Sequence, residues 1–171
     1  GIPHYLWSMQ AEPDKAPYTV GESRASRDSG GFSYSNARVM ENESGVVGMI
    51  LAYPLDDPYP LDDLTEVPDI VRPLVLLESK APGSWYINAL ATVETNRGKG
   101  VATRLLKNAE TRASNQGFTK SSLIVAAENR VAKNLYLKFG YEVHAALPIV
   151  AYPGCVHSGH WELMIKPLPK R

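Results

Sequence analysis

Two glycines and two cations lie close together between a predicted strand and a predicted helix. The segment reads Arg97-Gly98-Lys99-Gly100, and the apolar start of a helix follows at Val101. Glycine lets a backbone approach a ligand closely because it carries no side chain. The first amides of a helix have no internal partner, and the helix dipole favours an anion there. The pattern therefore predicts a cradle for a pyrophosphate, and the alternative is an ordinary basic turn.

Two common phosphate-binding motifs do not fit this segment. A nucleotide P-loop places Lys and then Ser or Thr after its last glycine, whereas Val101 follows Gly100. The dinucleotide fingerprint needs a third glycine, and Thr103 occupies that position. The predicted phosphate site is therefore of another kind.

The hexad Arg97-Gly98-Lys99-Gly100-Val101-Ala102 resembles a signature of the GNAT superfamily, the acetyl-CoA-dependent N-acyltransferases. The pattern of that family is Arg or Gln, two residues, Gly, one residue, and then Gly or Ala. Leu90-Ala91-Thr92 lies where the family has the end of the preceding strand. The clear resemblance covers residues 85–141, and residues 32–52 fit the preceding hairpin of the family loosely.

A second part of the resemblance lies downstream of the hexad. Asn129, Ala132 and Tyr136 are similar to the Asn, Ala and Tyr of the family's second signature. The following Phe139-Gly140-Tyr141-Glu142 also looks like the family. The hexad and this second signature together, on matching elements, are much more specific than either one alone.

The resemblance implies an α/β (α+β) fold, with a mixed, mostly antiparallel sheet flanked by helices. A central parallel strand pair would be splayed, and acetyl-CoA would lie between its strands, 85–93 and 120–126. Residues 1–171 would form a single N-acetyltransferase domain. The family usually has a strand before its first two helices. The chain starts at the helices, so that strand is expected to be missing or to lie outside this sequence.

The resemblance also implies a role for each site residue. The pantetheine amides would pair with the backbone near Leu90 and Thr92, like an added strand, and a backbone amide near Thr92 would stabilise the oxyanion. Asn129 would hydrogen-bond to the pantetheine arm, and Tyr136 would protonate the departing thiolate. Without the family, Tyr136 would be a core aromatic residue. The implied cofactor-binding residues are Leu90, Ala91, Thr92, Arg97, Gly98, Lys99, Gly100, Val101, Ala102, Thr103 and Asn129.

The general base is not assigned by the resemblance. Many relatives carry a Glu on one of the two splayed strands, but one such position here is Ile124, and the other strand offers only Tyr86 and Asn88. The open candidates are Glu78, Glu94, His157, His160 and a chain of waters. The two histidines also lie near Cys155, but no third and fourth ligand follows at zinc spacing, so no metal is expected.

The hydrophobic pattern predicts the elements that position these residues. The predicted strands span 32–40, 46–52, 85–93, 120–126, 141–150 and 161–166. The predicted helices lie near 5–9, 19–27, 70–80, 100–116 and 129–138. Asn42 to Gly45 is a hairpin turn signal, Gly117 is a helix stop, and Asn129 is a helix N-cap.

Residues 54–82 are interpreted as an insertion. The segment is rich in proline and has no Lys or Arg before Arg72. The acidic residues that precede Arg72 in it are Asp56, Asp57, Asp62, Asp63, Glu66 and Asp69. They form either a solvated loop or an acidic wall that attracts a cationic substrate.

Composition excludes several classes of protein. The 18 Lys and Arg residues balance the 18 Asp and Glu residues, which is unsuited to nonspecific nucleic-acid binding. The longest apolar stretches, such as 46–53, are too short to span a bilayer, and Gly1 to His4 is not a signal peptide. The chain lacks an initiator Met, so it is expected to start inside a longer gene product. Cys155 is the single cysteine, so no disulfide forms within the chain and a cytoplasmic location is expected.

Three functions are compared. The first is transfer of an acetyl group to a primary amine, on a small molecule or an exposed protein amino group, by direct attack in a ternary complex. The second is a non-catalytic acyl-CoA binder on the same fold, and the third is an interaction module that uses residues 54–82. The partner of the first is an amine acceptor, cationic if the acids act as a wall. A homodimer is left open.

Overall fold

The computed structural model describes residues 1–61 and 64–169. Within them, six strands form one sheet in the order β1-β2-β3-β4-β6-β5, and neighbouring strands are antiparallel except β3 and β4. The strands are β1 (Ala37–Asn42), β2 (Gly45–Pro54), β3 (Trp85–Thr92), β4 (Lys120–Ala126), β5 (Glu142–Pro148) and β6 (His160–Pro167). The helices are α1 (Ile2–Gln10), α2 (Pro17–Ala25), α3 (Arg72–Glu78), α4 (Val101–Asn115) and α5 (Arg130–Lys138), with 3-10 turns η1 (Tyr34–Asn36) and η2 (Glu94–Asn96). The expected mixed, mostly antiparallel sheet is confirmed.

The predicted elements are correct in type, but some of their ends are wrong. The first strand begins at Ala37 rather than at residue 32, because Ser33 caps η1 and its Oγ accepts the Ser35 N–H at 3.1 Å. The helix predicted for 70–80 spans only α3, where Pro73 fits the first turn. The strand predicted for 141–150 is the shorter β5.

The two faces of the sheet carry separate hydrophobic cores, because successive strand side chains point to opposite faces. On one face, α4 packs its predicted apolar stripe against β2 and β3. The buried residues of that stripe are Val101, Leu105, Leu106, Ala109 and Ala113. On the other face, Leu77 of α3 packs against Tyr86 and Leu163. Helix α3 therefore anchors the 54–82 segment to the sheet.

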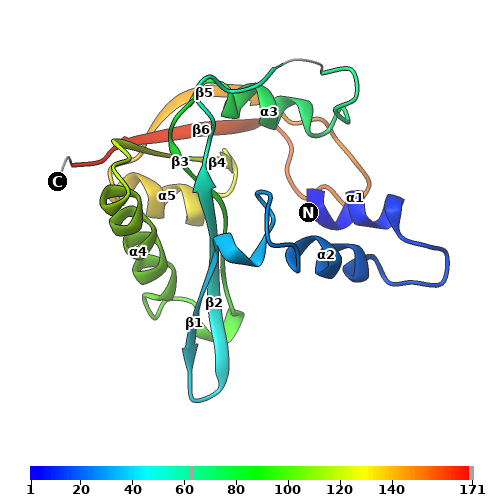
Figure 1. Cartoon of the computed structure of the whole chain (residues 1–171), viewed down its shortest axis with the longest axis horizontal. Helices are drawn as coiled ribbons and strands as arrows, with labels where there is room; N and C mark the ends of the chain where they lie inside the picture. Colours follow the sequence, from blue (N-terminus) through cyan, green and yellow to red (C-terminus); the bar gives the residue numbers. More distant parts are fainter. Residues whose placement is uncertain (62–63, 170–171) are drawn as a thin grey trace.

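The two N-terminal helices form a small separate layer. Figure 1 shows α1 and α2 side by side, with the β1–β2 hairpin between them and α4. Trp7 packs edge-on against Phe32. Gly21 lies so close to the Trp7 ring that a Cβ at this position would be 2.6 Å from it. No helix in the described ranges combines the length and apolar character that crossing a bilayer requires.

The parallel pair β3–β4 is joined at one end only. Register partners are Trp85 with Ser121, Tyr86 with Ser122, and Ile87 with Leu123, although both strands continue further. The strands therefore splay from Asn88 onwards, as the resemblance implied. The backbone edge of β3 beyond this point has no ladder partner on β4.

A β-bulge coincides with the start of the splay. Leu51 pairs with Ala89 and Ala52 pairs with Ile87, so Asn88 is an extra residue in β3. A bulge re-aims the side chain of the extra residue. Here the Nδ2 of Asn88 donates to the Tyr53 hydroxyl at 3.1 Å, on the sheet face that carries α3.

Buried serines hold the closed end of the splay. The Oγ atoms of Ser84 and Ser122 lie 2.6 Å apart, and Ser121 Oγ donates to the Trp85 carbonyl at 2.9 Å. Tyr141 then donates its hydroxyl to Ser121 Oγ at 2.9 Å. Each bond is buried, and hydrogen bonding removes the cost of placing these hydroxyls in the core.

Candidate active site

A cavity of about 820 Å³ lies where β3 and β4 diverge. It is enclosed by the end of β3, the segment leading into α4, and the first turns of α5. The lining residues are Leu90, Ala91, Thr92, Asn96, Arg97, Gly98, Gly100, Val101, Ala102, Thr103, Asn129, Val131, Ala132, Leu135 and Tyr136. The structure thus brings together all the predicted site residues except Lys99. Their individual roles stay predictions.

The N-terminus of α4 is open toward this cavity. Gly98 and Gly100 have φ values of 74° and 78°, and a Cβ on either would meet no atom within 4 Å. Gly100 provides no side-chain cap, and the first backbone bond of the helix is from Arg104 N–H to the Gly100 carbonyl at 3.0 Å. The amides of Val101 to Thr103 therefore have no helical partner and suit an anion.

The cations of the loop differ in position. Arg97 lines the cavity, and its Nη1 lies 3.8 Å from Glu94 in an exposed pair that contributes little to stability. Lys99 is exposed and does not line the cavity. The cavity lining also includes Asn96, Val131, Ala132 and Leu135, which were not among the predicted site residues. Val131 is 86% exposed, which marks it as an apolar contact at the cavity mouth.

Asn129 caps α5, as predicted. Its Oδ1 accepts the Ala132 N–H at 3.2 Å, while its Nδ2 makes no hydrogen bond to the described residues. The cap therefore uses the Oδ1 of Asn129, and its Nδ2 remains available to donate a hydrogen bond at the wall of the cavity. That donor could serve a carbonyl oxygen of a bound ligand.

Tyr136 lines the same cavity and is only 8% exposed. Burial raises its pKa to about 12, so the phenol is protonated at neutral pH. Its ring packs edge-on against Tyr141, with ring centroids 6.0 Å apart, and its hydroxyl makes no hydrogen bond to the described residues. Tyr136 is therefore held by ring packing and keeps a free proton donor.

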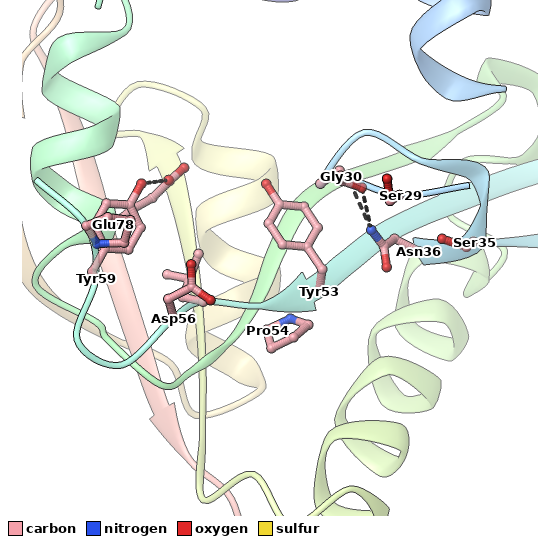
Figure 2. A pocket seen from close by; sticks show the side chains of 12 residues that line it. Ser29, Gly30, Ser35, Asn36, Tyr53, Pro54, Asp56, Tyr59 and Glu78 are labelled. Carbon is pink, nitrogen blue, oxygen red and sulfur yellow. Dashed lines mark hydrogen bonds between the residues drawn. The ribbon is translucent and has the colours of Figure 1, made fainter. Parts of the chain in front are cut away.

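A second cavity, of about 570 Å³, lies on the sheet face that carries α3. Its lining comes from the α2–β1 connection, the end of β2, the segment before α3 and the last residue of α3. The residues are Ser29, Gly30, Gly31, Ser35, Asn36, Tyr53, Pro54, Leu55, Asp56, Tyr59, Pro60 and Glu78. Figure 2 shows Tyr53 standing between the Tyr59–Glu78 pair and the loop that carries Gly30 and Asn36. Sequence reasoning missed this cavity.

The carboxyl group of Glu78, which lines this cavity, has a raised pKa. Burial raises the pKa of its carboxyl above the ordinary value, while hydrogen bonds from Tyr59 and Tyr86 oppose that rise. The Tyr59 hydroxyl donates to Glu78 Oε2 at 2.7 Å. Burial and the nearby Glu78 charge raise the pKa values of Tyr53 and Tyr59, so these phenols stay protonated.

The other candidates for a general base lie elsewhere. Ile124, at a position where many relatives carry a Glu, packs in the core under α3 and has no titratable group. Glu94 is exposed in the η2 turn and faces Arg97. His157 packs edge-on against Trp161 and lies 3.9 Å from Glu128, and His160 is exposed at the start of β6. Of the side chains named as candidates, Glu78 is the one that lines either cavity.

The acidic residues of segment 54–82 that the structure describes do not form a single cluster. Asp56 lines the second cavity, and Asp57 lies beside Gly83. Asp69 is exposed and pairs with Arg72 at 3.0 Å. Glu66 is also exposed, and Asp62 and Asp63 lie outside the described residues. The carboxylates of segment 54–82 that line the second cavity are therefore those of Asp56 and Glu78.

Residues 1–61 and 64–169 contain no group of three or more His, Cys, Asp or Glu side chains placed to hold a metal ion. Cys155, which lies near the two histidines in the sequence, donates its thiol to the His157 carbonyl at 3.1 Å. The thiol is therefore used within its own loop.

The fold is similar to that of known N-acetyltransferases. Mosquito arylalkylamine N-acetyltransferase-like 5b matches with a TM-score of 0.65 and 21% identity, over 80% of this chain and 76% of that one. Agmatine N-acetyltransferase matches with a TM-score of 0.65 and 16% identity, over 97% and 87%. Chaetomium thermophilum Naa20, in complex with a bisubstrate analogue, matches with a TM-score of 0.58 and 20% identity, over 92% and 75%. No curated protein sequence matches the chain.

A family model gives the assignment that these distant structures cannot. The model of the acetyltransferase (GNAT) family matches residues 4–141, which include most of α1, the sheet as far as β4, and both signatures. The match joins the hexad before α4 to the Asn129–Tyr136 segment, the two segments that enclose the first cavity. The chain therefore belongs to the acetyltransferase (GNAT) family.

Proposed function

We propose that this protein transfers the acetyl group of acetyl-CoA to a primary amine, by direct attack in a ternary complex. The acceptor is a small molecule or an exposed protein amino group. One observation carries the proposal: the open N-terminus of α4, the free amide donor of Asn129 and the protonated phenol of Tyr136 line a single cavity at the β3–β4 splay.

The residues of this cavity suit the successive parts of acetyl-CoA. The amides of Val101 to Thr103 and the Arg97 guanidinium would bind the pyrophosphate. The unpaired edge of β3 at Leu90 and Thr92 would hydrogen-bond to the pantetheine arm, as an added strand does. Asn129 Nδ2 would donate to a pantetheine carbonyl.

Tyr136 would supply the proton that the leaving group needs. The amine lone pair forms the C–N bond, and the electrons of the C–S bond pass to sulfur. The Tyr136 hydroxyl then donates its proton to that sulfur. A backbone amide near Thr92 would stabilise the oxyanion of the tetrahedral intermediate.

We also propose a cytoplasmic location, because the chain has a single cysteine and so cannot form the internal disulfide that is common in oxidising compartments.

The first experiment is acetyl transfer measured over a panel of amines. The panel holds benzylamine, phenethylamine, putrescine and a peptide with a free N-terminus, and free CoA is followed with a thiol reagent. We expect acetyl-CoA to raise Tm by mass action and at least one amine to release CoA faster than buffer alone. A Tm that does not respond to millimolar acetyl-CoA contradicts the proposal. A Tm rise without transfer to any amine indicates the non-catalytic binder instead.

A further inference from the structure

The second cavity has the composition of a site for a cation. Its lining contains the carboxylates of Asp56 and Glu78 and no Lys or Arg. The rings of Tyr53 and Tyr59 also line it, and aromatic faces attract cations. The volume of about 570 Å³ falls in the range of small-molecule sites.

Glu78 has no cationic partner within the described part of the chain. Its carboxylate accepts hydrogen bonds from Tyr59 and Tyr86, which are neutral donors. Partial burial of an anion without a countercharge is costly, because neutral hydrogen bonds replace only part of its hydration. A bound ammonium ion would remove that cost.

The second cavity also adjoins the point where the strands splay. Tyr53 lines the cavity and accepts a hydrogen bond from Asn88, the residue at which β3 and β4 cease to pair. Tyr86, which donates to Glu78, precedes Asn88 by two residues, or roughly 7 Å along a strand. The second cavity is therefore connected to the splayed strand β3 at the bulge, two residues before Leu90 of the first cavity.

We propose that this cavity binds the acceptor amine as an ammonium ion and that Glu78 removes its proton before attack. This assignment rests on the proposed function and gives that reaction its missing base. One N–H bond breaks, its electrons stay on nitrogen as the lone pair, and the proton passes to the Glu78 carboxylate and then to solvent. After attack, nitrogen loses a second proton to solvent, and a proton from solvent restores the Tyr136 phenol, so CoA leaves as the thiol and one proton is released overall.

The groups around Glu78 are neutral tyrosines and apolar side chains, with one further carboxylate. Tyr59, Tyr86 and Tyr53 face it and stay protonated, and Asp56 lies in the same cavity. Helix α3 also packs against β4, β5 and β6. Their side chains in this core do not titrate, and these are Ile124, Ala145, Leu147, Trp161, Leu163 and Ile165. The raised pKa of Glu78 strengthens it as a proton acceptor while leaving it ionised above that pKa.

The test is the pH profile of kcat/KM for the panel amine with the highest kcat/KM, in wild type and Glu78→Gln. In wild type, kcat/KM should rise with pH through the pKa of Glu78 and then level off. Glu78→Gln should lower kcat/KM at neutral pH by roughly 10²-fold, the scale of a lost general base. Its profile should keep rising tenfold per pH unit toward the pKa of the amine, because only neutral amine in solution then reacts.

Glu110→Gln is the matched control. Glu110 is a partly buried carboxylate that pairs with Lys166 at 2.7 Å on the opposite face of the sheet. This variant loses a charge and an ion pair without touching the cavity, so it should keep the wild-type profile. A Glu78→Gln enzyme that keeps both the rate and the profile would overturn the inference.

Tyr59→Phe gives a second test that does not remove the carboxylate. Loss of the Tyr59 hydrogen bond should raise the pKa of Glu78 further, because that bond stabilises the charged form. The acidic limb of the profile should therefore move to higher pH. A limb that stays in place would show that it belongs to another group. Neither result alters acetyl-CoA binding, so failure of this inference is separable from failure of the proposed function.

Discussion

The side chain of Asn88 reaches from the β3 bulge to the hydroxyl of Tyr53, a 3.1 Å hydrogen bond between the splayed strand and the second cavity. Gly31 supports this arrangement from the α2–β1 connection. A Cβ at Gly31 would lie 2.8 Å from Tyr53 Cζ, so no side chain fits there unless the tyrosine ring moves. The second cavity is thus linked to the splayed strand through the ring of Tyr53.

Gly31→Ala is therefore expected to push Tyr53 away from Asn88. The KM for the amine should rise about fivefold to tenfold, which corresponds to one lost hydrogen bond of about 1 kcal/mol. Tyr53→Phe, which removes the hydroxyl without steric pressure, should have a similar effect. Steady-state kinetics with saturating acetyl-CoA measures both. An unchanged amine KM in the two variants would separate this cavity from the acceptor.

Gly100→Asp is expected to abolish most of the Tm increase caused by acetyl-CoA. The new carboxylate would occupy the open space at the N-terminus of α4, where the phosphates are proposed to bind. Gly117→Asp is the control, because Gly117 also has a positive φ, of 85°, and nothing within 4 Å of its Cβ position, but follows the other end of α4. Both variants place a side chain on a residue with positive φ, 78° at Gly100 and 85° at Gly117. Equal Tm increases in the two would contradict the phosphate cradle.

Tyr136→Phe is expected to lower kcat by roughly 10²-fold or more and to leave acetyl-CoA affinity nearly intact. Its Tm should change little, because the Tyr136 hydroxyl has no partner among the described residues. Tyr141→Phe should do the reverse. It loses the bond to Ser121, which should cost about 1 kcal/mol and about 2–4 °C in Tm, while kcat stays near wild type. A normal kcat in Tyr136→Phe would reduce that residue to packing.

Asn129→Asp separates the two roles of Asn129. An aspartate still caps α5 by accepting the Ala132 N–H, but it cannot donate to a ligand carbonyl. We expect its Tm to stay near wild type and its Kd for acetyl-CoA to rise at least fivefold. Asn129→Ala should weaken binding and also lose about 1 kcal/mol of stability with the cap. Calorimetric titration and thermal melting measure the two effects, and unchanged affinity in Asn129→Asp would leave only the cap.

The acidic segment should make the reaction with a cationic amine sensitive to salt. Exposed carboxylates act through solvent, and salt screens them over about 8–10 Å. The kcat/KM for putrescine should fall with ionic strength more steeply than that for an uncharged amine. The variant that flattens this dependence replaces Asp56, Asp57, Asp62 and Asp63 with Asn. The charge-matched control replaces the exposed acids Glu12, Asp14, Glu41 and Glu43 with their amides. Equal salt dependence for charged and neutral amines would identify the acids as a solvated loop.

The cofactor side could be predicted from the sequence because its residues lie in two short segments with fixed spacing. The hexad Arg97–Ala102 and the helix from Asn129 to Tyr136 each occupy one local element, so a local pattern reports both. Lys99 is the exception. It lies between two glycines with positive φ, and the turn they form leaves its side chain exposed outside the cavity.

The second cavity could not be predicted in the same way. Gly31, Tyr53 and Glu78 come from three separate segments, and only tertiary packing brings them together. The bulge at Asn88 is equally invisible locally, because it is a shift in pairing between β2 and β3. The polar residues were visible in the sequence, but nothing in their spacing indicated that Glu78 would face three tyrosines.

The serine cluster joins β3 and β4 at the closed end of the splay, so a change in the angle between the two strands would pivot there. From Ile87 to Thr92, β3 extends about 16 Å beyond the last paired residue. A rotation of about 10° at the vertex would therefore move the open end by roughly 3 Å, enough to separate reacting atoms that must approach within about 3–3.5 Å. The Ser84–Ser122 hydrogen bond therefore lies at the point about which such a rotation would take place.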